Sequence, residues 1–270
     1  MKSRVSRGPR RVMAALLATL FAAGGAPILL APAATAGEAS IDRVGYTCTA
    51  QNGTIDLVLG GPQQFYVTAK TTLPDRVTSG STVSATAAEL TLILPPVLVN
   101  KLITKMDVKQ VKGWAISDVD LAGVAPGGTV VDTMTRSVDN LAVNDYVDLV
   151  ADQEISIVAK GTVGAIEVPQ FSGNGVVYVM MPKKFLLQPL LNPPVVDSIG
   201  DERGEADMDC VRDADTAAAR VIGSIPVGDG CSQASCPVPA ASGGGDTGGG
   251  DTGGDGSRRP PGPAAAAGWA

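Results

Sequence analysis

Residues 65–73 read Phe-Tyr-Val-Thr-Ala-Lys-Thr-Thr-Leu, and Pro74 follows them. Most of these residues are β-branched or aromatic, which is the composition of a β-strand. Comparable short runs recur along the chain, for example at residues 155–163 and 176–181, with turn-forming residues between them. Many short strands separated by turns are typical of an antiparallel β-sandwich. The sequence therefore predicts a β-sandwich domain over residues 37–228.

Three stretches refine this prediction. Residues 95–106 begin with two prolines and then repeat apolar residues every four positions, which predicts one short helix. The Asn52-Gly53 pair lies between two β-prone runs and predicts a tight hairpin turn. Residues 184–207 combine prolines and glycines with a cluster of acidic residues, which predicts a long loop. The length of the domain allows either one enlarged sandwich or two packed lobes.

Residues 1–36 have the pattern of a signal peptide. The first eleven residues carry five basic side chains and no acidic one, and an apolar stretch follows at residues 12–30. Ala34-Thr35-Ala36 then supplies the small residues that signal peptidase requires, which places the cut before Gly37. The Arg10-Arg11 pair leaves both general secretion and twin-arginine export open. We expect a secreted protein, extracellular or associated with the cell envelope.

The other end of the chain differs in composition. Residues 229–236 contain two of the cysteines and are expected to form a small disulfide loop, and residues 237–270 are rich in glycine and proline. Such a composition cannot bury enough apolar surface to order itself, so a disordered C-terminal tail is expected. Neither a sorting motif nor an apolar run of membrane length occurs in the tail. We therefore expect no membrane anchor after signal cleavage.

Composition excludes several classes of function. The chain of 270 residues contains no histidine, so it has no Ser-His-Asp triad, no Cys-His pair and no histidine-ligated zinc or haem. Its net charge is −6, and removal of the basic N-terminal segment would make it more negative. An acidic protein of this kind is not expected to bind nucleic acid.

The four cysteines are even in number and lie beyond the N-terminal segment, as disulfides of an exported protein would. Four cysteines allow three pairings. The short spacing of Cys231 and Cys236 favours a local loop, which leaves Cys48 to pair with Cys210. Cys231 and Cys236 do not have the spacing of a zinc knuckle, and Cys48 stands alone, so disulfides are favoured over a metal site.

Several short motifs in this order resemble a family of secreted actinobacterial proteins that carry a domain of unknown function. The matching residues are Tyr46-x-Cys48, Pro74-x-x-Val77-x-x-Gly80, Trp114 in a strand, and Cys210 followed by residues 221–227. The resemblance implies an immunoglobulin-like β architecture, a bridge from Cys48 to Cys210, and export to the cell envelope. It implies no enzymatic activity and supplies no catalytic residues.

Two groups of charged residues are candidate binding sites. Lys101, Lys105, Lys109 and Lys112 are spaced four, four and three residues apart, so they would form one basic stripe if the helix continued through them. The alternating pattern from Val108 onward instead predicts that the helix ends near Met106, which would leave the lysines as separate solvated residues. A basic patch could bind an anionic wall polymer.

The second group is acidic and lies in and after the predicted late loop. Carboxylates gathered in a loop could hold calcium, although the sequence has no Asp-x-Asp-x-Asp-Gly loop with a closing glutamate. Solvated surface is the default interpretation, so we expect no cofactor, with calcium as the alternative. The members of this group are Asp201, Glu202, Glu205, Asp207 and Asp209.

These observations favour a secreted, non-catalytic protein that serves binding or adhesion, with a cell-wall polymer or another surface protein as its partner. The alternatives are a glycosidase-like hydrolase that acts through paired carboxylates, and a purely structural spacer. The sequence offers few aromatic residues to line a sugar cleft, and it has no Gly-x-Ser-x-Gly or Ser-x-x-Lys motif. No catalytic residues are assigned. A deep cleft with two opposed carboxylates would favour the hydrolase.

Overall fold

A computed structural model describes residues 36–196, 202–213 and 218–240. The predicted signal peptide, apart from Ala36, and residues 241–270 of the predicted tail lie outside these residues. Within these residues the helices are α1 (Gly53–Leu59) and α2 (Pro96–Met106), and a 3-10 turn, η1, spans Ala218–Arg220. The strands are β1 (Ala36–Ala50), β2 (Gln63–Pro74), β3 (Thr82–Val83), β4 (Thr86–Leu94), β5 (Gln110–Ala125), β6 (Thr129–Asp148), β7 (Ile155–Val163), β8 (Ile166–Glu167), β9 (Gly175–Met180), β10 (Lys184–Val196), β11 (Glu202–Glu205), β12 (Met208–Arg212) and β13 (Val221–Val227).

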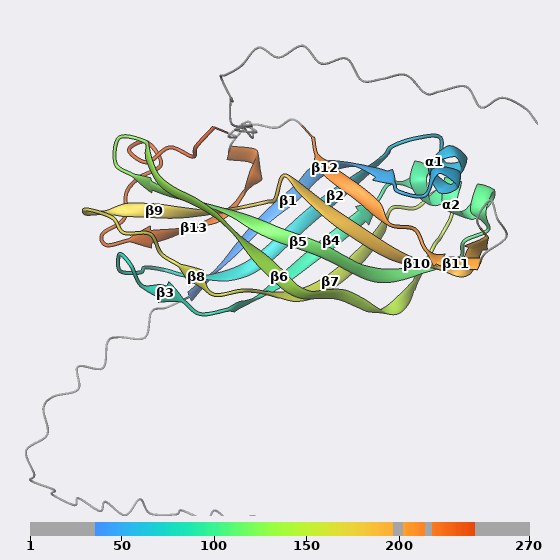
Figure 1. Ribbon diagram of the computed structural model, residues 1–270, viewed down its shortest axis with the longest axis horizontal. Helices are drawn as coiled ribbons and strands as arrows, with labels where there is room; N and C mark the ends of the chain where they lie inside the picture. The colour runs from blue at the N-terminus through green and yellow to red at the C-terminus, as the bar shows by residue number, and fades with distance from the viewer. Residues whose placement is uncertain (1–35, 197–201, 214–217, 241–270) are drawn as a thin grey trace, which may run out of the picture. The chain divides into compact units, whose positions relative to one another are not determined.

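Eleven of the strands form one antiparallel sheet in the order β11-β10-β12-β1-β2-β4-β7-β6-β5-β9-β13, and β10 pairs with β5 as well. This additional pairing closes strands β10, β12, β1, β2, β4, β7, β6 and β5 into a ring of hydrogen-bonded neighbours. In Figure 1 the ribbons of β5 and β10 pass in front of those of β1, β2 and β4. The main core lies between these opposite sides.

The prediction of a mainly antiparallel β fold is confirmed. The opposite sides of the ring face each other across a core, as the layers of a sandwich do, but hydrogen-bonded strands join them into one continuous sheet. The strand that completes the ring is β10, which lies within the region predicted to be a loop. That loop prediction is wrong: residues 184–196 form β10, and β11 follows at residues 202–205.

Strand β5 is the point where the sheet branches. Its first half pairs with β10 from Gln110 to Ile116, and its second half pairs with β9 from Asp120 to Val124. Along the same edge of β5, the pairing strand therefore changes from β9 to β10. Residues 181–183 connect these two strands. Strand β13 pairs with β9, and both lie at the end of the sheet away from the helices (Figure 1).

The alternating sequence of the ring strands places apolar side chains inside. In β1 the buried side chains are Val44, Tyr46, Cys48 and Ala50, at every second position. Strand β2 shows the same alternation throughout its length. Tyr46 is fully buried, its ring meets that of Phe185 edge-on with centroids 4.8 Å apart, and its hydroxyl donates to the carbonyl oxygen of Pro182 at 2.8 Å. An inward face of this kind fixes the register of the strands.

The disulfides join the pairs that the cysteine spacing predicted. Cys48 and Cys210 face each other as register partners on β1 and β12, both fully buried, with Cα atoms 4.0 Å apart. This separation is shorter than the 5.5–6 Å expected of a typical bridge because facing residues on neighbouring antiparallel strands approach closely. Cys231 and Cys236 close the short loop, with Cα atoms 6.0 Å apart.

The short disulfide loop packs against the sheet through Cys236. Cys236 is fully buried in a second, smaller core cluster with residues of β5 and β9. The hydroxyl of Tyr178 donates to the carbonyl oxygen of Cys236, and burial raises the pKa of this phenol. The first residues of the predicted tail continue the contact, because Val238 packs against the cluster and the carbonyl oxygen of Pro239 accepts from Arg220 at 2.8 Å.

The predicted helix at residues 95–106 is confirmed, since α2 spans Pro96–Met106. The hairpin predicted at Asn52-Gly53 is wrong, because these residues begin helix α1. The side chain of Asn52 accepts from the backbone N–H groups of Thr54 and Ile55 at 2.9 and 3.3 Å, which caps the helix. Gly60 ends it with a φ of 78°, a left-handed conformation that glycine adopts without strain.

Candidate ligand-binding cavity

The interior of the closed sheet is not completely filled. Leu90 and Leu92 of β4 lie opposite Ala69 and Val67, whose side chains are buried inside the ring, yet both leucines remain partly accessible. Ala159 of β7 pairs with Leu90 and is also partly accessible. Because inward-facing apolar side chains in a packed core are normally covered, their accessibility shows an internal cavity.

The cavity offers about 110 Å³ to the centres of water-sized molecules. A single water needs about 10–15 Å³ on this measure, so the space is far larger than a packing defect. Its walls come from both helices, the segments around them and seven ring strands, namely β2, β4, β5, β6, β7, β10 and β12. The apolar side chains of the wall include Ile55, Leu59, Leu90, Leu92, Leu102, Ala159 and Met181.

Helices α1 and α2 lie side by side at one end of the ring (Figure 1). Ile55 and Leu59 of α1 line the cavity from this end, one turn apart, and so do Leu98 and Leu102 of α2. Since α1 connects β1 to β2 and α2 connects β4 to β5, both helices are held by strands of the ring. They form the wall of the cavity at that end.

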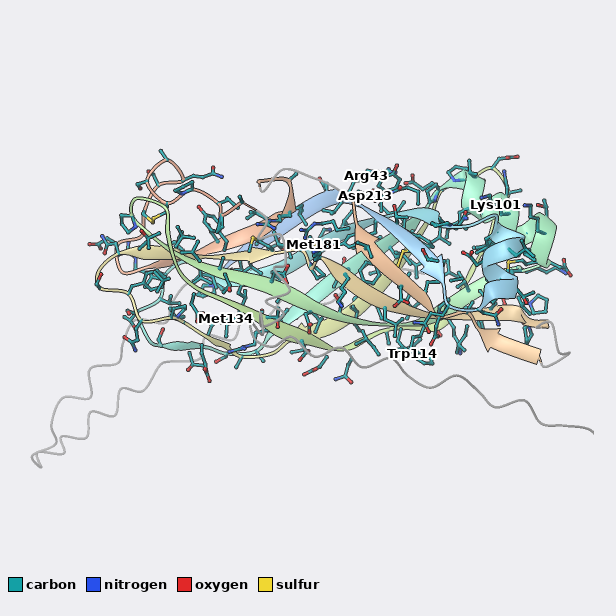
Figure 2. The ribbon with its side chains drawn as sticks, turned by 45° about the horizontal axis from the view of Figure 1, so that its top comes forward. Arg43, Lys101, Trp114, Met134, Met181 and Asp213 are labelled. Atoms are coloured by element: carbon teal, nitrogen blue, oxygen red, sulfur yellow. A yellow bond between two sulfur atoms is a disulfide. The ribbon has the colours of Figure 1, made fainter. Side chains whose placement is uncertain are left out.

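Two of the predicted lysines hold this helical wall together. The ammonium group of Lys101 donates to the side-chain oxygen of the buried Gln63 at 2.9 Å, and that of Lys105 donates to the carbonyl oxygen of Val58 at 3.2 Å. Gln63 begins β2 and Val58 belongs to α1, so α2 is tied to both. Figure 2 places Lys101 at the helical end.

The other two lysines lie elsewhere, so the four do not form one stripe. Lys109 follows the end of α2 and makes an exposed ion pair with Asp107 at 3.8 Å. Lys112 belongs to β5, and its ammonium group lies 4.5 Å from the centre of the Tyr146 ring. The helix ends at Met106, as the alternation after it indicated. The basic stripe that a longer helix would have produced is therefore not formed.

The predicted acidic group is also dispersed where the structure describes it. Asp207 accepts from the side-chain amide of Gln188 at 3.2 Å, and Asp209 accepts from that of Gln51 at 3.1 Å. Asp201 lies outside the described residues, as do the side chains of Glu202 and Glu205. Within the part of the chain that is described, no three His, Cys, Asp or Glu side chains are gathered as metal ligands.

The polar side chains that line the cavity are already bonded to other protein groups. The indole of Trp114 donates to the side-chain oxygen of Gln188, and the hydroxyl of the buried Ser117 donates to the carbonyl oxygen of Asp118 at 3.1 Å. Lys112, the remaining one, contacts Tyr146 as described. Among the residues whose side chains are described, the lining contains neither aspartate nor glutamate. An apolar molecule therefore suits this cavity, because it can bind without breaking a hydrogen bond within the protein.

A second, smaller cavity of about 20 Å³ continues the interior, on the same measure. Its walls include Val179, Ile222 and Leu73, and it shares Leu90, Met181 and Pro182 with the first cavity. The one carboxylate among its lining residues is Asp118. Within the described part of the chain, neither cavity is thus lined by the two opposed carboxylates that a glycosidase-like hydrolase would use.

A charged cluster lies where β9 gives way to β10. Asp120 of β5 is partly buried, and burial raises the pKa of its carboxyl group, while the nearby guanidinium groups of Arg212 and Arg220 oppose the rise. The guanidinium of Arg212 also donates to the carbonyl oxygen of Met181. These contacts fix the backbone next to the boundary between the two cavities.

The residues that form the cavity were not singled out by the sequence. Residues 90–94 are a short apolar run of strand length, and this run supplies Leu90, Leu92 and Leu94 to the wall. Their alternation was the available signal for which side chains face inward. That the inward face remains unfilled depends on the closure of the ring by β10, which the loop prediction for residues 184–207 missed.

Fold and cavity together define an all-β protein in which a closed antiparallel sheet surrounds an apolar internal cavity. Residues 45–223 match the model of a family of unknown function, DUF6801, and the chain belongs to this family. No curated protein and no solved structure matches the chain. The family assignment covers the first disulfide, both helices and the strands of the ring, so the cavity lies within the matched residues.

In the part of the chain that the structure describes, no helix has the length and apolar character needed to cross a membrane.

Proposed function

We propose that this protein is a secreted, non-catalytic binding protein that holds an apolar small molecule inside its closed sheet. The observation that carries the proposal is the cavity of about 110 Å³, whose walls are apolar and whose polar side chains already have partners within the protein. Eight-stranded closed sheets have an interior wide enough for one small ligand. Cavities with apolar walls stay dry and take up apolar molecules.

The proposal of export rests on the sequence of residues 1–36 and on the two disulfides. Disulfides persist in oxidising compartments and are rare in the reducing cytosol. A binding protein outside the cell could carry or store a molecule that dissolves poorly in water. Contact with a cell-wall polymer or another surface protein remains a separate prediction about the outer surface of the molecule.

Binding of an uncharged apolar dye tests the proposal. We expect the folded full chain to bind N-phenyl-1-naphthylamine at one saturable site, with a rise in dye fluorescence because the dye leaves water. The variant Ala159→Phe places a phenyl ring into the cavity and should weaken dye binding at least tenfold. Val158 is the neighbouring residue in β7 and is 44% exposed, so Val158→Phe serves as the matched control and should bind the dye normally.

Thermal unfolding of both variants separates a filled cavity from a damaged fold. Filling an existing cavity should leave the stability of Ala159→Phe unchanged or raise it, whereas a large side chain forced into a packed core costs about 1–3 kcal/mol. The smaller change Ala159→Leu should act in the same direction. The absence of a saturable site, or equal dye affinity for the two phenylalanine variants, would refute the proposed function.

A further inference from the structure

Met181 lies at the boundary between the two internal cavities. Its side chain is almost completely buried, at 1% exposure, and it lines both the larger and the smaller cavity. Figure 2 shows Met181 near the middle of the sheet, whereas Lys101 marks the helical end. The larger cavity thus extends from the helices to Met181, and the smaller one continues past it toward Val179 and Ile222.

The backbone around Met181 is held in place. Its N–H donates to the carbonyl oxygen of Arg220 at 2.8 Å, and its own carbonyl oxygen accepts from the guanidinium of Arg212. The carbonyl oxygen of the next residue, Pro182, accepts from the hydroxyl of Tyr46 at 2.8 Å. The side chain, by contrast, is an unbranched thioether with three rotatable bonds, which lets methionine adapt to the space around it.

This arrangement favours a particular shape of ligand. Two apolar cavities in succession, which meet at Met181, Leu90 and Pro182, form an elongated apolar space. Such a space suits a long unbranched hydrocarbon chain better than a compact ring system. On the basis of the proposed function, we propose that the ligand carries one long unbranched hydrocarbon chain and that Met181 determines how long that chain can be. Met181 is then a specificity-determining residue.

The inference predicts how affinity depends on chain length. Each methylene group that moves from water into the cavity should tighten binding about fourfold. For straight-chain alcohols of about 8 to 18 carbon atoms, affinity should therefore rise with length until the chain end meets Met181, and then level off. Displacement of N-phenyl-1-naphthylamine from the full chain measures this series.

Substitution of Met181 should move the point at which affinity levels off. Met181→Ala removes three heavy atoms and joins the two cavities, so the preferred chain should become longer by about three carbon atoms. Met181→Leu keeps a large but branched and stiffer side chain that adapts less to the chain end, so it should make the preferred chain shorter than in the wild type. Because Met181→Leu is a mild change in volume, it keeps the test valid if Met181→Ala folds poorly.

Met180 provides the matched control. It precedes Met181, is equally well buried at 4% exposure, and belongs to the smaller core cluster rather than to the walls of either cavity. Met180→Ala should therefore lose stability like Met181→Ala but keep the chain-length preference of the wild type. If the wild type binds chains and neither Met181 variant changes the preferred length, the inference fails while the proposed function stands. If the wild type binds the dye but no chain displaces it, the inference also fails.

Discussion

The hydroxyl group of Tyr46 on β1 donates a hydrogen bond to the carbonyl oxygen of Pro182, which lies between β9 and β10. The two residues are 136 positions apart in sequence and both are buried. Because proline has no N–H group, its carbonyl oxygen is the backbone group through which Pro182 can be hydrogen-bonded. The bond from Tyr46 thus holds the connection between β9 and β10 to the opposite side of the core. It passes directly beside the boundary between the two cavities.

Removal of this hydroxyl should destabilise the fold. Tyr46→Phe leaves the carbonyl oxygen of Pro182 without this donor in a buried place, which should cost about 1–3 kcal/mol of unfolding free energy. Urea unfolding measures the loss. The ring and its contact with Phe185 are kept, so the effect reports the hydrogen bond. An unchanged unfolding midpoint would show that water replaces the phenol at this position.

The two disulfides should contribute unequally. Cys48–Cys210 spans 162 residues and Cys231–Cys236 only 5, so loop-closure entropy gives about 5 kcal/mol for the first and about 2 kcal/mol for the second. Replacement of Cys48 and Cys210 by alanine should therefore cost about 2–5 kcal/mol, more than replacement of Cys231 and Cys236. Denaturant unfolding of both double variants checks the order. Non-reducing peptide mapping of the wild type checks the pairing itself, and a peptide that joins Cys48 to Cys231 would contradict it.

Gly113 should be required where the ring closes. It has a φ of 148°, and a Cβ atom there would lie 2.3 Å from the carbonyl oxygen of Gln188 on the neighbouring strand β10. Gly113→Ala should thus push β5 and β10 apart, with a loss of about 1–3 kcal/mol from the backbone conformation alone and weaker dye binding. Gly53→Ala is the control, because an added Cβ there has no neighbour within 4 Å and helix α1 begins at this residue. Dye titration and thermal unfolding compare the two variants. An equal effect of both substitutions would contradict a role for Gly113 in closure.

Asp120 should make stability depend on pH. Burial raises the pKa of this carboxyl group in the folded state above its ordinary value of 3.8. The folded protein then holds this proton more tightly than the unfolded chain does. The contribution of Asp120 to the free energy of unfolding is therefore fully present below the unfolded-state pKa and is lost as pH rises through the folded-state pKa. Asp120→Asn cannot ionise and should gain stability relative to the wild type over that same rise. Unfolding experiments from about pH 3 to pH 8 should show the two curves diverge, and parallel curves would contradict the raised pKa.

The sequence predicted the strand-rich fold well because alternation records which side chains face inward. Residues 65–73 and 155–163 show this alternation, and both are strands of the ring. The proline pair at residues 95–96 and the apolar repeat after it likewise located α2. The Asn52-Gly53 pair misled the prediction because asparagine followed by glycine is favoured both in a hairpin turn and at the start of a helix. Ile55, Leu59 and Gly60 were the signals for a helix.

The cavity could not have been predicted in the same way. Strand β10 contains Pro189, Pro193 and Pro194, which normally argue against a strand in the middle of a sheet. Pro189 lies opposite Gly113, where the absence of a side chain on β5 lets the two strands approach. Closure of the ring therefore depends on a match between two distant positions, and the unfilled space inside it depends on that closure.

The placement of the first disulfide also affects how the chain acquires its bonds. When a chain emerges N-terminus first, Cys48 becomes accessible early. Its thiol cannot form the native bond until the strand that carries Cys210 has also emerged. Cys210 emerges before Cys231 and Cys236, so the first thiol that Cys48 can meet is its native partner. Pairings between distant strands form slowly, which gives an oxidant time to act before the ring shuts over the two sulfur atoms. In an exported chain, this order of the cysteines would favour the native pairs over mispaired bonds.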